Sequence, residues 1–219
     1  MKKVLAILIA FGLLSVAALG CGGKEVTPEE YVQGMYKLLV NMDEEGAKKV
    51  GISSGDVKKY QEALKKSAGD SANKLNESFK KQYGVTVDEK LIAAWATEYF
   101  NAIKKLTCTT TVESKSDTRC KVKLSTTFID VNALGKSAME KSQQTIKASD
   151  YSDSEEYYRA LLPEYVKVLT EELKNYQPSA DTNSVTLDLK KEGKNWTYDD
   201  ASKFSDTITS AVIKNDQGE

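Results

Sequence analysis

The sequence lacks histidine altogether, and it contains only three cysteines and three prolines among 219 residues. Without histidine, the chain has neither the usual general base nor the commonest transition-metal ligand, and it cannot form a Ser-His or Cys-His nucleophile pair. Three cysteines alone also argue against the zinc and iron sites that clusters of Cys and His form. We therefore expect no cofactor and no metal site.

No charge of one sign dominates the chain. Its formal net charge is −1, and this becomes −3 when the two lysines within residues 1–20 are removed. A dense basic surface, which nucleic-acid binding needs, is therefore not expected. The length suits one sizeable domain with its own core.

Long apolar runs are also missing, except at the N-terminus. Lys2 and Lys3 precede an apolar segment of 16 residues, Val4–Leu19, and the small residue Gly20 follows. This order is typical of a secretory signal. The segment is shorter than the roughly 20 residues that a membrane-spanning helix needs, so a permanent span is the weaker alternative.

The end of this segment is more specific than a general secretory signal. Ala18-Leu19-Gly20-Cys21 resembles the lipobox of bacterial lipoproteins. The resemblance implies that residues 1–20 are a cleaved signal peptide and that Cys21 is acylated. It also implies an extracytoplasmic protein anchored to a bacterial membrane by an N-terminal lipid. The alternative is an ordinary signal that ends at a chance cysteine. Residues 21–26 would form a short tether, which can reach roughly 20 Å.

Three helices are expected in the first half of the chain. Thr27-Pro28-Glu29-Glu30 predicts the first, with Thr27 as the N-cap, proline at the first helical position and Glu30 closing a capping box. The second begins around Ser53 and continues to about Tyr83, with a bend or break expected at Gly69. The third begins at Thr86–Glu89 and has the richest apolar face in the chain, so we expect it to be the most buried.

After Leu106 the apolar period changes from 3.6 to 2, which predicts a β-hairpin. Cys108 and Cys120 fall on the same face, and pairing them places the turn near Ser114. In an exported protein, such a pair is expected to form a disulfide. We therefore predict a structural disulfide between Cys108 and Cys120, and we prefer it to a redox-active pair because the Cys-x-x-Cys spacing is absent.

The second half continues with helices and another hairpin. Asp130 is expected to cap a fourth helix. A capping box at Ser152–Glu155 predicts the start of a fifth helix, which should kink or restart at Pro163. A strand around 185–189, a turn at 192–195 and a short strand at 196–198 follow. Asp199 or Asp200 caps a last helix.

Together these elements predict an α+β fold. We expect a curved antiparallel sheet of about four strands, formed by two hairpins, packed with about six helices. Residues 27–214 would form a single domain, and residues 215–219 a frayed tail.

The order of elements, with Lys191-Glu192-Gly193-Lys194-Asn195-Trp196 as the turn into the last strand, resembles uncharacterised bacterial lipoproteins with a cystatin-like or nuclear-transport-factor-like cone domain. The resemblance implies a concave sheet face or a pocket. The extra helices between the two hairpins depart from the simplest cone.

Some enzymes of that superfamily combine a buried Asp base with Tyr donors and need no histidine. In this sequence Tyr99, Tyr157 and Tyr165 lie on apolar helical faces, which indicates core positions. Asp130 and Asp200 are explained as helix caps. Asp150, Asp153 and Glu155 lack the spacing of a calcium loop. We assign no catalytic residue.

We predict a lipoprotein that acts as a binding or interaction module. Its partners would be the membrane, through the lipid on Cys21, and either a small ligand or a neighbouring envelope protein. Two alternatives stay open: a small histidine-free enzyme of the cone superfamily, and an envelope structural protein.

Overall fold

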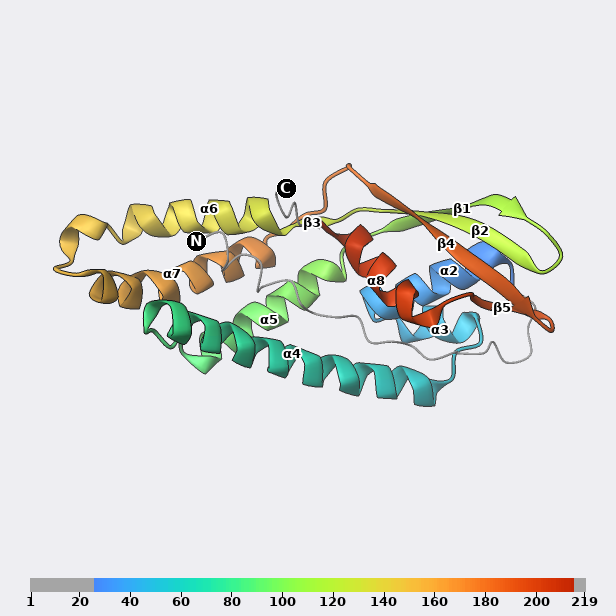
Figure 1. Ribbon diagram of the computed structural model, residues 1–219, viewed down its shortest axis with the longest axis horizontal. Coiled ribbons are helices and arrows are strands. Elements are labelled where there is room, and N and C mark those ends of the chain that lie inside the picture. Colours follow the sequence, from blue (N-terminus) through green and yellow to red (C-terminus); the bar gives the residue numbers. More distant parts are fainter. Residues whose placement is uncertain (1–25, 215–219) are drawn as a thin grey trace.

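The computed structural model describes residues 26–214, apart from a few side chains in two of its helices. The molecule is elongated (Figure 1). A four-stranded sheet covered by helices forms one end, and a group of long helices forms the other. The predicted signal peptide 1–20, Cys21 with most of the tether, and the tail 215–219 lie outside the described residues.

The first described helix, α2 (Pro28–Tyr36), begins as its sequence predicts. Glu30 N donates to Thr27 Oγ1 at 3.2 Å, and Thr27 N donates to Glu30 Oε2 at 2.8 Å, so both halves of the capping box are present. The helix continues as a π-helical turn, η1 (Lys37–Asn41), and ends at Met42, which has a positive φ of 57°. It therefore ends before the short helix that contains Gly46.

Two long helices follow the short helix α3 (Glu44–Lys49). Helix α4 (Ser54–Tyr83) is continuous over 30 residues, so the break expected at Gly69 is wrong. Helix α5 (Glu89–Ile103) is capped by Asp88, whose side chain accepts from Lys90 N at 2.7 Å. Its apolar face is buried as predicted, through Ile92, Trp95, Ala96, Tyr99, Ala102 and Ile103.

The two predicted hairpins form one antiparallel sheet. Its strands are β1 (Cys108–Lys115), β2 (Arg119–Thr126), β4 (Asn183–Glu192) and β5 (Asn195–Tyr198), in the order β1-β2-β4-β5. One face is polar and exposed, and the other is buried by alternate residues such as Val122, Leu124 and Leu187. The α+β class and the four-stranded antiparallel sheet are confirmed; the cystatin-like identity stays a prediction.

The predicted bridge between Cys108 and Cys120 is absent, and both cysteines are free. Cys108 pairs with Thr126 and Cys120 with Lys115, because the hairpin turns after Lys115 and the register shifts at a bulge between Val112 and Ser114. Seven residues of β1 separate Cys108 from the partner of Cys120. At about 3.3 Å per residue this is roughly 23 Å, far beyond the reach of a disulfide.

The helical end of the molecule is formed mainly by α6 and α7, together with the ends of α4 and α5 (Figure 1). Helix α6 (Val131–Thr145) leads through a short 3-10 turn, η2 (Ala148–Asp150), to α7 (Ser154–Lys174). Helix α7 is capped by Asp153 and includes Pro163 without ending or restarting there, so the predicted restart is wrong. Ring contacts of Tyr158 with Tyr83 at 4.5 Å join α7 to the end of α4.

A second, two-stranded parallel pair links the two ends of the molecule. It consists of β3 (Ile129–Asp130) and β6 (Ile213–Lys214), and the sequence did not predict it. Strand β6 directly follows the last helix, α8 (Ala201–Val212). The last helix is thereby fixed to the start of α6.

Helices α2 and α8 both pack on the buried face of the sheet (Figure 1). Tyr31 of α2 lies 5.2 Å from the ring of Tyr198, and Phe204 of α8 stacks on the same ring at 3.5 Å. These rings therefore occupy part of the face that the cone resemblance implied would be concave. The pocket described next lies elsewhere.

Candidate functional site

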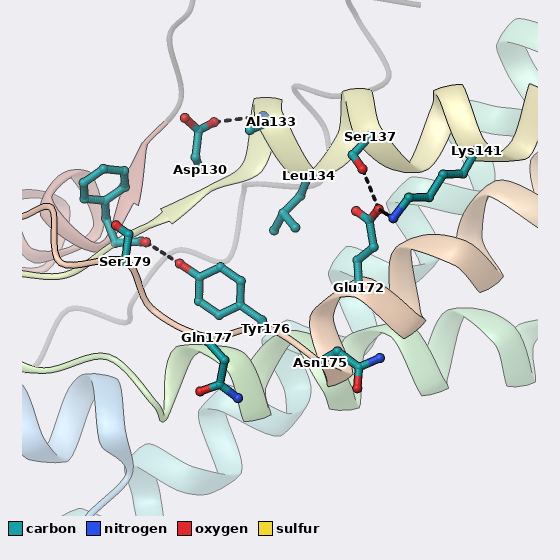
Figure 2. A pocket seen from close by; sticks show the side chains of 11 residues that line it. Asp130, Ala133, Leu134, Ser137, Lys141, Glu172, Asn175, Tyr176, Gln177 and Ser179 are labelled. Carbon is teal, nitrogen blue, oxygen red and sulfur yellow. Dashed lines mark hydrogen bonds and ion pairs between the residues drawn. The ribbon is translucent and has the colours of Figure 1, made fainter.

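A groove of about 510 Å³ opens where the sheet end meets the helical end of the molecule (Figure 2). The first turns of α6, the last turn of α7 and the loop that follows α7 form its walls. The residues that line it are Phe128, Asp130, Ala133, Leu134, Ser137, Lys141, Glu172, Asn175, Tyr176, Gln177 and Ser179. Its size is typical of pockets for small ligands.

Two hydrogen bonds fix the sheet side of the groove. The hydroxyl of Tyr176 donates to the carbonyl oxygen of Phe128 at 2.6 Å, which ties the loop after α7 to the segment that leads into α6. Asp130 Oδ1 accepts from Ala133 N at 2.9 Å as the N-cap of α6, while Oδ2 lies 3.8 Å from Lys214 Nζ. Burial raises the pKa of Tyr176, and the charge of Asp130 raises it further, so the phenol stays neutral and able to donate.

The C-terminal end of α7 is stabilised by a lysine from another helix end. Lys105 Nζ donates to the carbonyl oxygens of Lys174 at 3.3 Å and Tyr176 at 2.9 Å. A cation at this place satisfies carbonyl groups that have no partner within the helix and complements the helix dipole. The start of the loop that carries Tyr176 and Gln177 is therefore held by Lys105 and by the Tyr176 hydroxyl.

Glu172 is the most unusual side chain of the groove. Its Oε1 accepts from Ser137 Oγ at 2.6 Å and pairs with Lys141 Nζ at 2.8 Å, so that α7 is bound to α6 (Figure 2). Its Oε2 is buried and has no hydrogen-bond partner, and the side chain as a whole is only 12% exposed. A buried acceptor without a partner costs about 1–3 kcal/mol, and more when it is charged.

A second unpartnered polar atom belongs to Tyr165, which precedes Glu172 by seven residues on α7. The Tyr165 side chain is fully buried, and its hydroxyl has no hydrogen-bond partner. Burial raises the pKa of Tyr165, and the charge of Glu172 raises it further, which indicates that the two groups are close. An added donor at Glu172 would remove the larger of the two energetic costs.

The groove combines an apolar floor with polar walls. Phe128, Leu134 and Tyr176 supply the apolar surface, and the walls carry more acceptors than fixed donors. Such a surface suits a small ligand that has an apolar face and offers N–H or O–H groups. Within residues 26–214, no group of three or more His, Cys, Asp or Glu side chains is arranged to hold a metal ion.

The structure distributes the predicted residues over several places. Asp130 and Asp200 are helix caps as predicted, since Lys203 N donates to Asp200 Oδ1 at 3.4 Å, and Asp130 also lines the groove. Tyr99 and Tyr165 are core residues as predicted, whereas Tyr157 is half-buried and contacts the rings of two other tyrosines. Cys108 and Cys120 lie in the sheet and do not line the groove.

Sequence reasoning missed Glu172, Tyr176 and the groove itself. In the sequence, Glu172 is one of two adjacent acids on a charged helix, which is the usual pattern of a solvated surface. The only signal was Asn175-Tyr176-Gln177-Pro178, where polar and aromatic residues follow a long helix directly. That signal indicates a turn but does not reveal a site.

Within residues 26–214, no helix is both long enough and apolar enough to span a bilayer. The model of a family described as a domain of unknown function (DUF5105) matches residues 49–213. This range contains every groove residue and leaves out α2.

No curated protein is significantly similar to the chain. Among solved structures, it is similar to one from Bacillus subtilis subsp. subtilis strain 168, named as a "putative lipoprotein (ycdA)", with a TM-score of 0.49 and 16% identity. The match covers 85% of this chain and 56% of the other, so the chain spans just over half the length of that structure.

Proposed function

The chain belongs to the DUF5105 family, whose function is unknown, and we propose that it is a lipoprotein held outside the cytoplasm whose groove binds a small ligand. The lipoprotein part is supported by the order of residues in 1–21, which ends in Ala18-Leu19-Gly20-Cys21. Two acyl chains on Cys21 would be enough for stable membrane anchoring.

The anchor can be tested separately from the groove. Protein expressed in its own host is fractionated, and its intact mass is measured. We expect the wild-type chain in the membrane fraction, starting at Cys21 and carrying the mass of its lipid. Cys21→Ser should lose both the lipid and the cleavage, whereas Cys108→Ser, the matched control, should keep both. An unmodified Cys21 in the wild-type protein would refute the anchor.

The proposal that the groove binds a small ligand rests on one observation. The Glu172 carboxylate lines the groove and is mostly buried, yet only one of its oxygens has partners. Oε2 is closed off from the groove in this structure, so a ligand N–H or O–H group would supply the missing donor after a rotation of the carboxylate toward the groove. The apolar floor would cover the ligand's carbon atoms, so we propose a small amine or polyol rather than an anion.

Thermal unfolding in the presence of small amines and polyols tests this proposal. We expect at least one compound to raise the Tm of the wild-type protein. Glu172→Gln should lose that increase, whereas Glu171→Gln, an exposed neighbour on the same helix, should keep it. An increase that is equal in Glu172→Gln and in the wild type would place the ligand elsewhere.

The enzyme alternative gains no support from the groove. Among the described residues that line it, Asp130 and Glu172 are the carboxylates, and each already faces a lysine. A neighbouring envelope protein remains the other occupant that the groove could accept. It would be recognised as a retained protein rather than a retained small molecule.

A further inference from the structure

We propose that one end of the sheet, formed by residues 115–119 and 190–194, rests on the anionic headgroups of the membrane, so that the groove stands away from the bilayer. We call these residues the sheet tip. The inference rests on the proposed lipid at Cys21, and it adds an orientation that the lipid alone does not determine.

The start of α2 lies beside the sheet tip. Tyr31 contacts the ring of Tyr198 at 5.2 Å. At the other end of the helix, the Tyr36 hydroxyl lies 2.6 Å from Thr126 Oγ1, at the far end of β2. Helix α2 therefore runs along the sheet and begins at the tip, as Figure 1 shows.

The tether is short compared with the molecule. Cys21 precedes Val26 by five residues, which reach at most about 18 Å at 3.6 Å each. Strand β2 alone, from Arg119 to Thr126, is about 23 Å long at 3.3 Å per residue. A lipid on Cys21 can thus lie close to the sheet tip, and it cannot bring the far side of the helical end to the bilayer without turning the molecule on its side.

The charge of the tip favours the upright orientation. Its two turns contain five basic residues, Lys115, Arg119, Lys190, Lys191 and Lys194, and two acidic residues, Asp117 and Glu192. Arg119 is partly neutralised by Asp199 at 2.7 Å, and Lys190 by Glu192 at 2.9 Å. Lys194 is exposed on the second turn. Basic residues are attracted to an anionic membrane surface.

This orientation limits what can reach the groove. Phe128 and Asp130 follow the far end of β2, so the groove begins about 23 Å from the sheet tip. That distance exceeds the Debye length of about 8 Å at physiological ionic strength, so membrane charge is screened there. The ligand would therefore arrive from the aqueous side, and a lipid within the bilayer would not reach it.

Lysine acylation followed by mass spectrometry can test the orientation. The lipidated protein is reconstituted on phosphatidylcholine vesicles that contain phosphatidylglycerol, and its labelling is compared with that in detergent. We expect severalfold slower acylation of Lys115, Lys191 and Lys194 on the vesicles. Lys80, Lys81 and Lys90, which are exposed at the helical end, should react equally in both conditions and serve as the internal control.

Protection of the helical-end lysines, or equal labelling of all six, would overturn the inference. Lys190, which also lies in the sheet tip, should be protected on the vesicles in the wild type. Replacing Lys115, Lys191 and Lys194 by glutamine should leave the protein attached through its lipid but remove the protection of Lys190, whereas the same replacement at Lys80, Lys81 and Lys90 should leave that protection unchanged. Wild-type protein that does not float with the vesicles at all would refute the anchor itself. Floating protein with an unprotected tip would refute only the orientation.

Discussion

At the residue scale, a buried polar group holds the first helix to the sheet. Thr126 is fully buried, and its hydroxyl lies 2.6 Å from the Tyr36 hydroxyl, 3.1 Å from the Thr107 carbonyl and 2.8 Å from the Thr127 carbonyl. These bonds compensate for burying two hydroxyl groups. They also fix where α2 ends along β2.

Thr126→Val should therefore destabilise the protein by about 1–3 kcal/mol, because the Tyr36 hydroxyl would stay buried without a partner. Urea unfolding would measure the loss. Thr111→Val, at an exposed position of the same sheet, should change the stability by less than 0.5 kcal/mol, as is usual for surface positions. Equal effects of the two substitutions would show that the hydroxyl group makes no difference.

The half-buried thiol of Cys108 predicts how stability depends on pH. Burial raises the pKa of Cys108 from 9.0 to about 12, with a smaller opposing effect of Lys37. Because the folded-state value is the higher one, the stabilisation is complete below about pH 9 and is lost as the pH rises toward 12. The loss is up to about 1.4 kcal/mol per pH unit.

Urea midpoints at pH 8 and pH 10 would test this dependence. Burial also raises the pKa of Tyr36, Tyr60, Tyr99 and Tyr165, so the wild-type protein should lose stability steeply above about pH 10. Cys108→Ala should lose less between pH 8 and pH 10. A Cys108→Ala variant with the same pH dependence as the wild type would contradict the role of the thiol.

At the element scale, α2 and the chain around Val50 pack closely through Gly34. A Cβ atom at Gly34 would overlap both methyl groups of Val50, which is buried. The glycine therefore permits a close approach, although it lies inside a helix, where glycine is normally unfavourable.

Gly34→Ala should destabilise the protein by about 1–3 kcal/mol through overpacking. Adding Val50→Ala should recover part of this loss, so the two substitutions should not be additive. Gly55→Ala is the matched control: at this exposed helical position a Cβ meets only Ser53 Oγ at 3.6 Å, and it should stabilise by up to about 1 kcal/mol. Additive effects of Gly34→Ala and Val50→Ala would contradict the close contact.

The first hairpin shows what alternation can and cannot predict. A period of two assigns residues to a face, and Val122 and Leu124 are buried as expected. The register depends on the turn and on bulges, neither of which alternation reveals. The turn lies after Lys115 instead of near Ser114, and this small difference separates Cys108 from Cys120 along the strands.

Peptide mapping without a reducing agent would test the corrected register. Both cysteine-containing peptides should be alkylated as free thiols after unfolding, because the two residues are too far apart to form a bridge. A linked pair of these peptides would contradict the strand pairing. Both thiols should react slowly in the folded protein, because Cys120 is buried and the pKa of Cys108 is raised to about 12.

Helix starts were the most predictable elements of the chain. The signals at Thr27, Asp130 and Asp200 are local, since a side chain caps a backbone amide within three residues. The parallel pair β3–β6 was not predictable, because it joins two-residue strands that lie more than 80 residues apart. The continuous α7 shows that tertiary packing can retain a helix through Pro163.

At the scale of the whole molecule, the arrangement of the helices around the sheet could not be predicted from the sequence. The predicted cone would leave a concave face, but α2 and α8 occupy it through Tyr31 and Phe204. The groove instead forms where α6 and α7 meet the sheet end. Its residues come from segments about 45 residues apart, and local patterns do not indicate that they meet.

The central claim is that this groove holds a small ligand, and native mass spectrometry of protein purified from its own host tests it most directly. Ala133 is exposed and lines the groove, so Ala133→Trp should fill the groove without disturbing the core. Gln143→Trp, at an exposed position of the same helix away from the groove, is its control. We predict a retained small molecule on the wild type and on Gln143→Trp, and none on Ala133→Trp. A wild-type protein that retains nothing, or a molecule that stays bound to Ala133→Trp, would contradict the account.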